Sequence, residues 1–252
     1  MTLERTYFEI PSAAGPVVAS VLTPPTGSNH PLVILATGDS PSGSDGQTWQ
    51  QLTPRLLARG MAVLLFDFSG LGHSPGVYRE LTLTVGCQNF DAVMEWAQAE
   101  GEHDRGRIGI VGSSYGGNVA LLRAVDYPSI GAIGLKSAST FLPEGYQLQY
   151  GVELMKNWGE DGYSEEVGLN YTAVLDSLFH NTYEAASRIS CPVRIVNGTA
   201  DTAVPIRHAR DLLRVMPNAS IFEIEGADHW YAESDEWERM ATNIIDFLGA
   251  HL

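Results

Sequence analysis

Short apolar runs alternate along this sequence with segments whose apolar residues recur at helical spacing. Residues 32–36 and 61–66 are apolar throughout, which is typical of strands buried on both faces of a sheet. Further strands are predicted by shorter apolar or alternating runs at residues 6–10, 17–22, 107–111, 131–136, 193–197 and 220–224. Helices are predicted by helical spacing at residues 49–59, 85–100, 116–126, 206–215 and 237–248. This order predicts an α/β fold with a mainly parallel central sheet flanked by helices.

The alternation stops between residues 138 and 190. This stretch has short helical pieces and no clear strand, and it is rich in large aromatic side chains. They are Tyr146, Tyr150, Trp158, Tyr163, Tyr171 and Tyr183. We interpret residues 138–190 as a cap inserted into a core formed by residues 1–137 and 191–252. The aromatic side chains can line a substrate pocket or hold the insertion together, and the sequence leaves both uses open.

Composition and charge narrow the classes of partner. The chain has 252 residues, of which 44% are hydrophobic and 18% charged, as in an ordinary globular domain. Its formal net charge is −15, and an acidic surface repels nucleic-acid phosphates and anionic lipids. We therefore expect a small-molecule substrate, with no nucleic-acid or membrane partner. The sequence leaves the oligomeric state open, with a homodimer as one alternative.

The amino-terminal residues and the two cysteines bear on the location of the protein. Residues 1–5 lack the apolar stretch of a signal peptide, and no segment is apolar for long enough to cross a bilayer. Cys87 and Cys191 lie far apart in apolar surroundings, which favours buried free thiols over a disulfide. These features predict a cytoplasmic protein.

Residues 112–116 read Gly-Ser-Ser-Tyr-Gly and lie between a predicted strand and a predicted helix. A G-x-S-x-G sequence in this place is typical of the sharp turn that presents a nucleophilic serine, here Ser114. Glycines on both sides let neighbouring backbone pass close to the strained turn. The amino terminus of the helix beneath Ser114 favours a developing oxyanion. We therefore predict that Ser114 is a catalytic nucleophile.

A serine hydroxyl needs a base to remove its proton. Of the seven histidines, His229 is the one that follows the last predicted strand within a loop, and His73, its rival, precedes the nucleophile. Asp201 follows the strand after the insertion, so the chain order is Ser, Asp, His, as expected with this kind of elbow. We predict that Asp201 orients the base, the alternative being that it only caps a turn. The adjacent Asp228 is poorly placed to reach the ring.

The tetrahedral intermediate needs backbone donors. The predicted oxyanion hole consists of the N–H of Tyr115, next to the nucleophile, and the N–H of Asp39, in the loop after residues 32–36. The Asp39 carboxylate would be unfavourable if it pointed inward, so it points away, binds a cationic substrate group or orients water. No metal is expected, because no two histidines have the spacing of a zinc-binding helix and the cysteines form no ligand pair.

Three motifs resemble those of the small bacterial carboxylesterases of the feruloyl/cinnamoyl esterase type, within the α/β-hydrolase superfamily. They are residues 66–74, residues 112–116 and residues 224–229. The superfamily resemblance covers essentially the whole chain. It implies an α/β-hydrolase fold with an inserted cap and ester hydrolysis through an acyl-enzyme, with no cofactor. It also implies a catalytic triad formed by Ser114, Asp201 and His229.

The sequence departs from that family's pattern in ways that leave the substrate open. Residues 37–38 are Thr-Gly where His-Gly is usual, Tyr115 stands where Gln or Met is common, and Trp230 follows the predicted base. We expect a serine carboxylesterase, with Phe141, Trp158 and Trp230 as substrate contacts. The alternatives are a thioesterase, acyltransferase, peptidase or C–C bond hydrolase on the same triad, or a non-catalytic receptor of the same fold.

Overall fold

A computed structural model describes residues 4–252 and contains an eight-stranded sheet in the order β1-β2-β4-β3-β5-β6-β7-β8. The strands are β1 Tyr7–Ile10, β2 Val17–Leu22, β3 His30–Ala36, β4 Ala62–Phe66, β5 His103–Ser113, β6 Ile130–Lys136, β7 Val193–Gly198 and β8 Ala219–Ile224. β1 and β2 are antiparallel to their neighbours, whereas β3 to β8 pair in parallel. The predicted mainly parallel sheet is confirmed. Residues 1–3, where the amino-terminal stretch considered above begins, lie outside the described residues.

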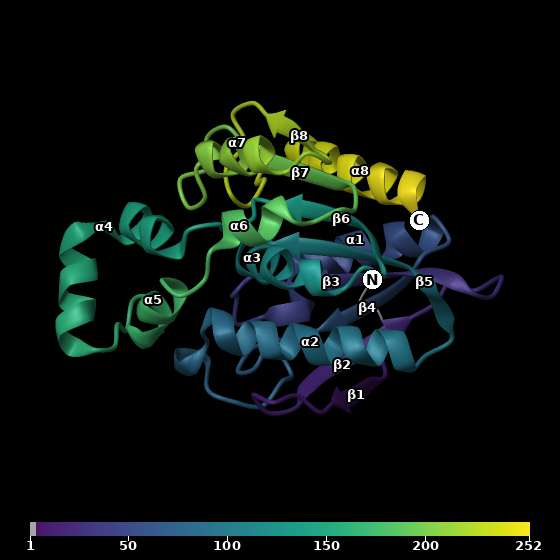
Figure 1. Cartoon of the computed structure of the whole chain (residues 1–252), viewed down its shortest axis with the longest axis horizontal. Helices are drawn as coiled ribbons and strands as arrows, with labels where there is room; N and C mark the ends of the chain where they lie inside the picture. Colours follow the sequence, from purple (N-terminus) through teal and green to yellow (C-terminus); the bar gives the residue numbers. More distant parts are fainter. Residues whose placement is uncertain (1–3) are drawn as a thin grey trace.

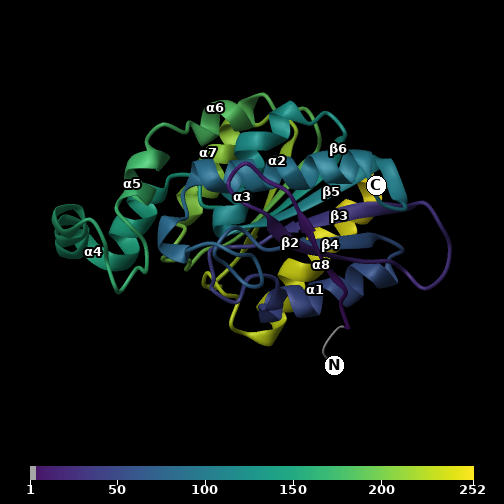
Figure 2. The same cartoon turned by 90° about the horizontal axis from the view of Figure 1, so that it is seen from below.

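Helices cover both faces of this sheet (Figure 1 and Figure 2). The helices are α1 Gln47–Ala58, α2 Leu83–Ala99, α3 Ser114–Arg123, α4 Leu142–Asp161, α5 Thr172–Ser177, α6 Thr182–Ser187, α7 Ile206–Val215 and α8 Ser234–His251. α1 and α8 lie on one face, where they pack with Val33 and Leu35 of β3. α2, α3 and α7 lie on the other face, with Leu32 and Ile34. β3 is apolar at successive positions because both of its faces are buried.

Most predicted elements are present, with shifted ends. The strand predicted at residues 107–111 extends over the whole of β5, because its polar first residues still pair with β3. The closing helix, predicted from residue 237, begins at Ser234, and Asp235 and Glu236 in its first turn suit the positive end of the helix dipole. Apolar periodicity misses both extensions because the side chains in them are largely polar or charged.

Residues 137–192 connect β6 to β7 and contain α4, α5 and α6. In Figure 1, α4 and α5 extend beyond one side of the sheet, whereas α6 packs against α3. α4 consists of two helices joined at Gly151, whose φ of 82° suits a residue without a side chain. Trp158 fills the interior of this region, edge to face with Tyr146 and Tyr171. Aromatic packing therefore holds part of this connection together.

The helical segment 141–182, which holds α4 and α5, leaves and rejoins the core at nearly the same place. Thr140 Oγ1 and Tyr183 Oη, just outside its two ends, are hydrogen-bonded at 2.8 Å. At the returning end, Thr182 Oγ1 donates to Asn118 Oδ1 of α3 at 2.7 Å. The two ends of the segment are therefore fixed to each other and to the helix that follows the predicted nucleophile.

The described residues bear on the expectations about membrane-spanning segments, metal sites and a disulfide. Across residues 4–252, no helix combines the length and the apolar character needed to cross a bilayer. In the same range, no three His, Cys, Asp or Glu side chains are grouped so that they could hold a metal ion. Cys87 and Cys191 are free thiols, but Cys191 is only half-buried because it precedes β7 rather than lying within the sheet.

Candidate active site

Ser114 stands at the junction of β5 and α3 with a backbone φ of 49°. Residues other than glycine rarely adopt this left-handed conformation, so the turn is strained. The glycines around it allow close approach: a Cβ on Gly116 would lie 2.2 Å from the carbonyl oxygen of Thr37. A Cβ on Gly38 would lie 3.5 Å from Ser114 Cβ. The elbow is thus pressed against the loop after β3, which brings the serine and that loop together.

The ring of His229 is hydrogen-bonded to the carboxylate of Asp201. His229 Nδ1 lies 2.9 Å from Asp201 Oδ2, and the Asp201 side chain is fully buried. Asp201 Oδ1 also accepts the N–H groups of Ala203 at 3.0 Å and Val204 at 2.7 Å. Burial by itself would raise the pKa of Asp201, but the hydrogen bond and charge of His229 and the Val204 N–H outweigh it and hold the pKa below its usual value. The carboxylate is therefore kept ionised beside the imidazole.

The loops that carry this acid and this base cross each other closely. A Cβ on Gly198 would lie 2.1 Å from the carbonyl oxygen of Ala227, so the crossing requires a glycine. Thr199 Oγ1 accepts the N–H of Gly226 at 2.9 Å. Because these contacts join the end of β7 to the end of β8, they fix the separation between the carboxylate and the imidazole.

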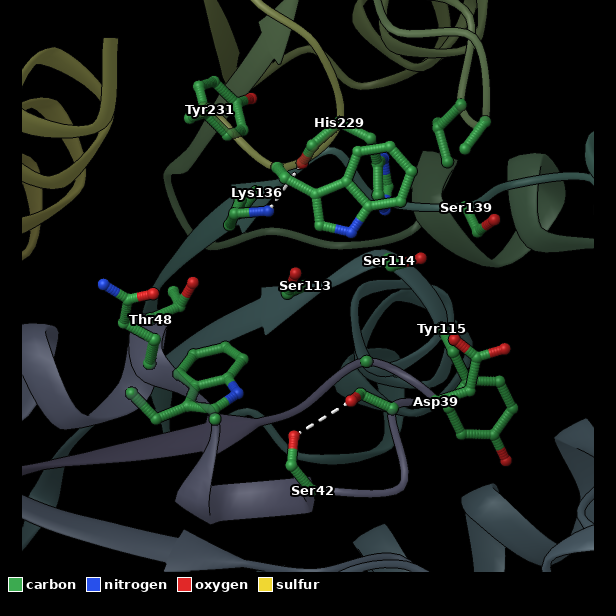
Figure 3. Close-up of a pocket in the computed structure, with 18 of the residues that line it drawn as sticks. Asp39, Ser42, Thr48, Ser113, Ser114, Tyr115, Lys136, Ser139, His229 and Tyr231 are labelled. Atoms are coloured by element: carbon green, nitrogen blue, oxygen red, sulfur yellow. Dashed lines mark hydrogen bonds between the residues drawn. The ribbon is translucent and has the colours of Figure 1, made fainter. Parts of the chain in front are cut away.

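Lys136, the last residue of β6, contacts the loop that carries His229 (Figure 3). Its Nζ donates to the His229 carbonyl oxygen at 2.9 Å and lies 4.9 Å from the centre of the Tyr231 ring. Burial lowers the pKa of Lys136 from 10.5 to about 8, against the opposing charges of Asp201 and Asp228. This ammonium therefore carries a desolvation penalty in the folded state.

The backbone groups predicted as oxyanion donors both belong to residues that line the same cavity as Ser114 (Figure 3). The Tyr115 ring points into the core, where its Oη donates to the Thr82 carbonyl oxygen at 2.7 Å. The Asp39 carboxylate faces the cavity, which is one of the orientations that the sequence left open. Burial raises the pKa of Asp39, and its own N–H and the charge of His229 oppose this only in part.

A cavity of about 830 Å³ lies over Ser114, lined by the loop after β3, the elbow, α4 and the loop after β8. Trp230 lines it and is 63% exposed. Phe141 and Trp158, predicted as substrate contacts, do not line it. Phe141 is an exposed residue at the start of α4, and Trp158 is 1% exposed because it forms the interior of the helical segment. The lining of this cavity therefore gives no support to a substrate contact for these two residues.

Sequence reasoning did not single out two other residues of the cavity, Lys136 and Tyr78. A lysine that ends an apolar strand is a signal that could have pointed to Lys136. Tyr78 lies in a short irregular stretch with no periodic pattern, so nothing in the sequence marked it. Tyr146 and Tyr150, one turn apart on α4, also line the cavity. Tyr146 also packs against the interior Trp158.

A model of a protein family described as "Alpha/beta hydrolase family" matches residues 33–243. Among curated proteins, the mitochondrial palmitoyl-protein thioesterase ABHD10 of Mus musculus is 25% identical over 204 residues, covering 75% of this chain and 66% of that protein. An uncharacterised protein of Mycobacterium tuberculosis is 27% identical over 180 residues, covering 71% of this chain and 56% of that protein. This chain thus spans less than two thirds of the length of these relatives.

Among solved structures, Est1E of Butyrivibrio proteoclasticus, with ferulic acid bound, superposes with a TM-score of 0.85 at 22% identity. The match covers 97% of this chain and 98% of that one. Mouse alpha/beta hydrolase domain-containing protein 10 gives a TM-score of 0.77 at 20% identity, covering 98% and 99% of the two chains. At these identities the similarity establishes a shared fold.

Proposed function

The chain belongs to the alpha/beta hydrolase family, and on that premise we propose that it is a serine hydrolase that cleaves a carboxylic ester through an acyl-enzyme intermediate. The observation that carries the proposal is a strained serine and a carboxylate-bound histidine that line one cavity. A serine on a left-handed turn is exposed for attack, and a histidine fixed by an ionised aspartate is a base of defined tautomer.

In the proposed reaction, Ser114 Oγ attacks the ester carbonyl while His229 Nε2 removes the hydroxyl proton. Nε2 is the free nitrogen of the ring, because Nδ1 is bonded to Asp201. The ionised carboxylate stabilises the imidazolium that forms. Among the described residues, no hydrogen bond joins Ser114 Oγ to His229 Nε2, so this step requires the two atoms to come within hydrogen-bond reach of each other.

The negative charge that develops on the carbonyl oxygen is stabilised by the N–H groups of Asp39 and Tyr115. The imidazolium then donates its proton to the leaving alcohol, which departs as the acyl-enzyme forms. His229 next removes a proton from a water molecule, which attacks the acyl carbon, and the released proton returns to Ser114 Oγ. The carboxylic acid leaves and the resting enzyme is restored.

The segment at residues 138–190 is proposed to act as a cap over a core of residues 1–137 and 191–252. This rests on Tyr146 and Tyr150 of α4, which line the cavity together with the elbow. The substrate is proposed to be a small-molecule ester. A thioester is the second candidate, because a relative at 25% identity is named as a thioesterase. Both substrates use the same acyl-enzyme chemistry.

The experiment that tests this proposal is labelling with a fluorophosphonate probe, which reacts with activated serines. Wild type should be labelled and Ser114→Ala should not, whereas Ser113→Ala, one residue earlier, should still react with the probe. With p-nitrophenyl esters and acyl thioesters, Ser114→Ala should lose on the order of 10⁶ in kcat. Hydrolysis at the wild-type rate by Ser114→Ala would refute the proposal, and the ratio of ester to thioester turnover would separate the two candidate substrates.

A further inference from the structure

One carboxylate in the cavity has no partner among the described residues. Apart from His229, the charged side chains among the described residues that line the cavity are those of Asp39, Lys136 and Glu238. Lys136 is bonded to the His229 carbonyl, and Glu238 is ion-paired with Arg55. Within residues 4–252, neither an ion pair nor a hydrogen bond joins the Asp39 carboxylate to another side chain. A half-buried carboxylate left in this state favours any cation that can reach it.

Aromatic side chains stand around this carboxylate. Tyr78, Tyr146 and Tyr150 line the cavity beside Asp39, and the ring centres of Tyr146 and Tyr150 are 6.4 Å apart. Burial, and after it the negative charge of Asp39, raises the pKa of all three hydroxyls, in agreement with their place in the same cavity. Glu166 adds a further negative charge near Tyr150. This end of the cavity is therefore both anionic and aromatic.

An anion combined with aromatic faces is the environment that binds ammonium groups. The ring faces attract a cation through their quadrupoles, and the carboxylate neutralises its charge. A neutral apolar group would gain the aromatic contact but would leave the half-buried carboxylate unpaired. We propose that this end of the cavity recognises a protonated amine or quaternary ammonium group of the substrate, with Asp39 as its counter-ion and the three tyrosines as its walls. The proposal rests on the hydrolase function proposed above.

The same arrangement has a consequence for the chemical step. The Asp39 carboxylate lies beside its own backbone N–H, the group proposed to stabilise the oxyanion. An ionised carboxylate there repels the negative charge that develops on the substrate. A bound ammonium offsets that repulsion, so a cationic substrate should show a higher kcat as well as a lower KM. A neutral substrate must react beside the uncompensated charge.

The test compares esters that differ only in charge. On the acyl side, the p-nitrophenyl ester of 4-(trimethylammonio)butanoate is matched with that of 5,5-dimethylhexanoate, in which a carbon replaces the nitrogen. On the alcohol side, choline acetate ester is matched with 3,3-dimethylbutyl acetate. In at least one pair, wild type should prefer the cationic ester by about tenfold or more in kcat/KM. The ratio within one variant cancels any general change in activity.

Three variants locate the source of that preference. Asp39→Asn keeps the shape and the backbone N–H but removes the charge, and it should lower the cationic-to-neutral ratio toward one. Tyr150→Leu removes an aromatic wall and should lower the ratio in part. Glu238→Gln removes the same charge from the same cavity at an ion-paired position, and it should leave the ratio at its wild-type value. A ratio that survives in Asp39→Asn, or falls equally in Glu238→Gln, overturns the proposal.

The remaining outcomes separate this inference from the hydrolase function. If hydrolysis depends on Ser114 but neither pair shows a preference for the cationic ester, the cation site is overturned and the hydrolase proposal stands. If no ester is hydrolysed, the hydrolase proposal fails, and saturation-transfer NMR of butyltrimethylammonium decides the site. Binding to wild type that is lost in Asp39→Asn supports the cation site. Absence of binding to wild type overturns it.

Discussion

Replacing the buried Lys136 with methionine should change how the stability of the protein depends on pH. The side chain is 5% exposed, and its pKa falls from 10.5 in an unfolded chain to about 8 in the folded protein. Each tenfold change in proton affinity is worth about 1.4 kcal/mol, so this difference corresponds to about 3 kcal/mol. Methionine has a similar shape and no proton to lose, and therefore lacks this contribution.

The direction of the effect follows from which state holds the proton. Below about pH 8, Lys136 is protonated in both states, and the folded protein bears the full penalty of a buried ammonium. Between about pH 8 and 10.5, the folded state has released the proton while the unfolded chain still binds it, so stability rises with pH. Relative to Lys136→Met, the free energy of unfolding of wild type should thus rise by up to about 3 kcal/mol from pH 7 to 10.5.

Urea denaturation of both proteins at several pH values between 7 and 10.5 measures this difference. Groups shared by the two proteins, such as the tyrosines and the two thiols, cancel in it. Lys156→Met is the matched control, because Lys156 is exposed on α4 and should give a difference that does not vary with pH. A pH-independent difference for Lys136→Met, or one that falls as pH rises, would refute the claim that this ammonium is buried at a cost.

Two further substitutions test the triad and the elbow. Asp201→Asn removes the carboxylate charge beside His229, so kcat should fall by about 10⁴. Asp228→Asn is the control, because its amide oxygen can still accept the Trp230 N–H, and it should have a far smaller effect. Equal losses of kcat in the two variants would contradict the assignment of Asp201. Gly116→Ala places a Cβ 2.2 Å from the Thr37 carbonyl oxygen and should destabilise the fold by about 1–3 kcal/mol or more. Gly249→Ala, where a Cβ meets nothing within 4 Å, should not lower stability, and equal denaturation midpoints for the two variants would show that the elbow tolerates a side chain.

The features that could be predicted from the sequence are those with a local pattern. Apolar runs marked the buried strands, and the glycine spacing at residues 112–116 marked a tight turn between a strand and a helix, which is the turn found at Ser114. The order of Asp201 and His229 after separate strands anticipated their contact, because parallel strands end at the same edge of a sheet.

The features that escaped prediction depend on contacts between distant residues. Lys136 bonds a carbonyl 93 positions away, and a lysine at the end of a strand looks the same in sequence whether or not that partner exists. Trp158 and Tyr150 are both aromatic residues of α4, yet one fills the interior of the segment and the other lines the cavity. Which way the Asp39 side chain points is equally hidden, because a loop has no periodicity from which to read it.

The hydrogen bond between Thr140 and Tyr183 has a consequence for how this molecule can diverge. The length of a segment whose two ends are joined by such a contact can change with little effect on the free energy of folding. Each doubling of the length of a flexible loop adds only about 0.6 kcal/mol of closure entropy. Residues 141–182 can therefore be exchanged as a module while the strands keep their register. Such an exchange would replace the part of the cavity wall that α4 supplies, whereas Ser114, Asp201 and His229 lie outside the exchanged residues.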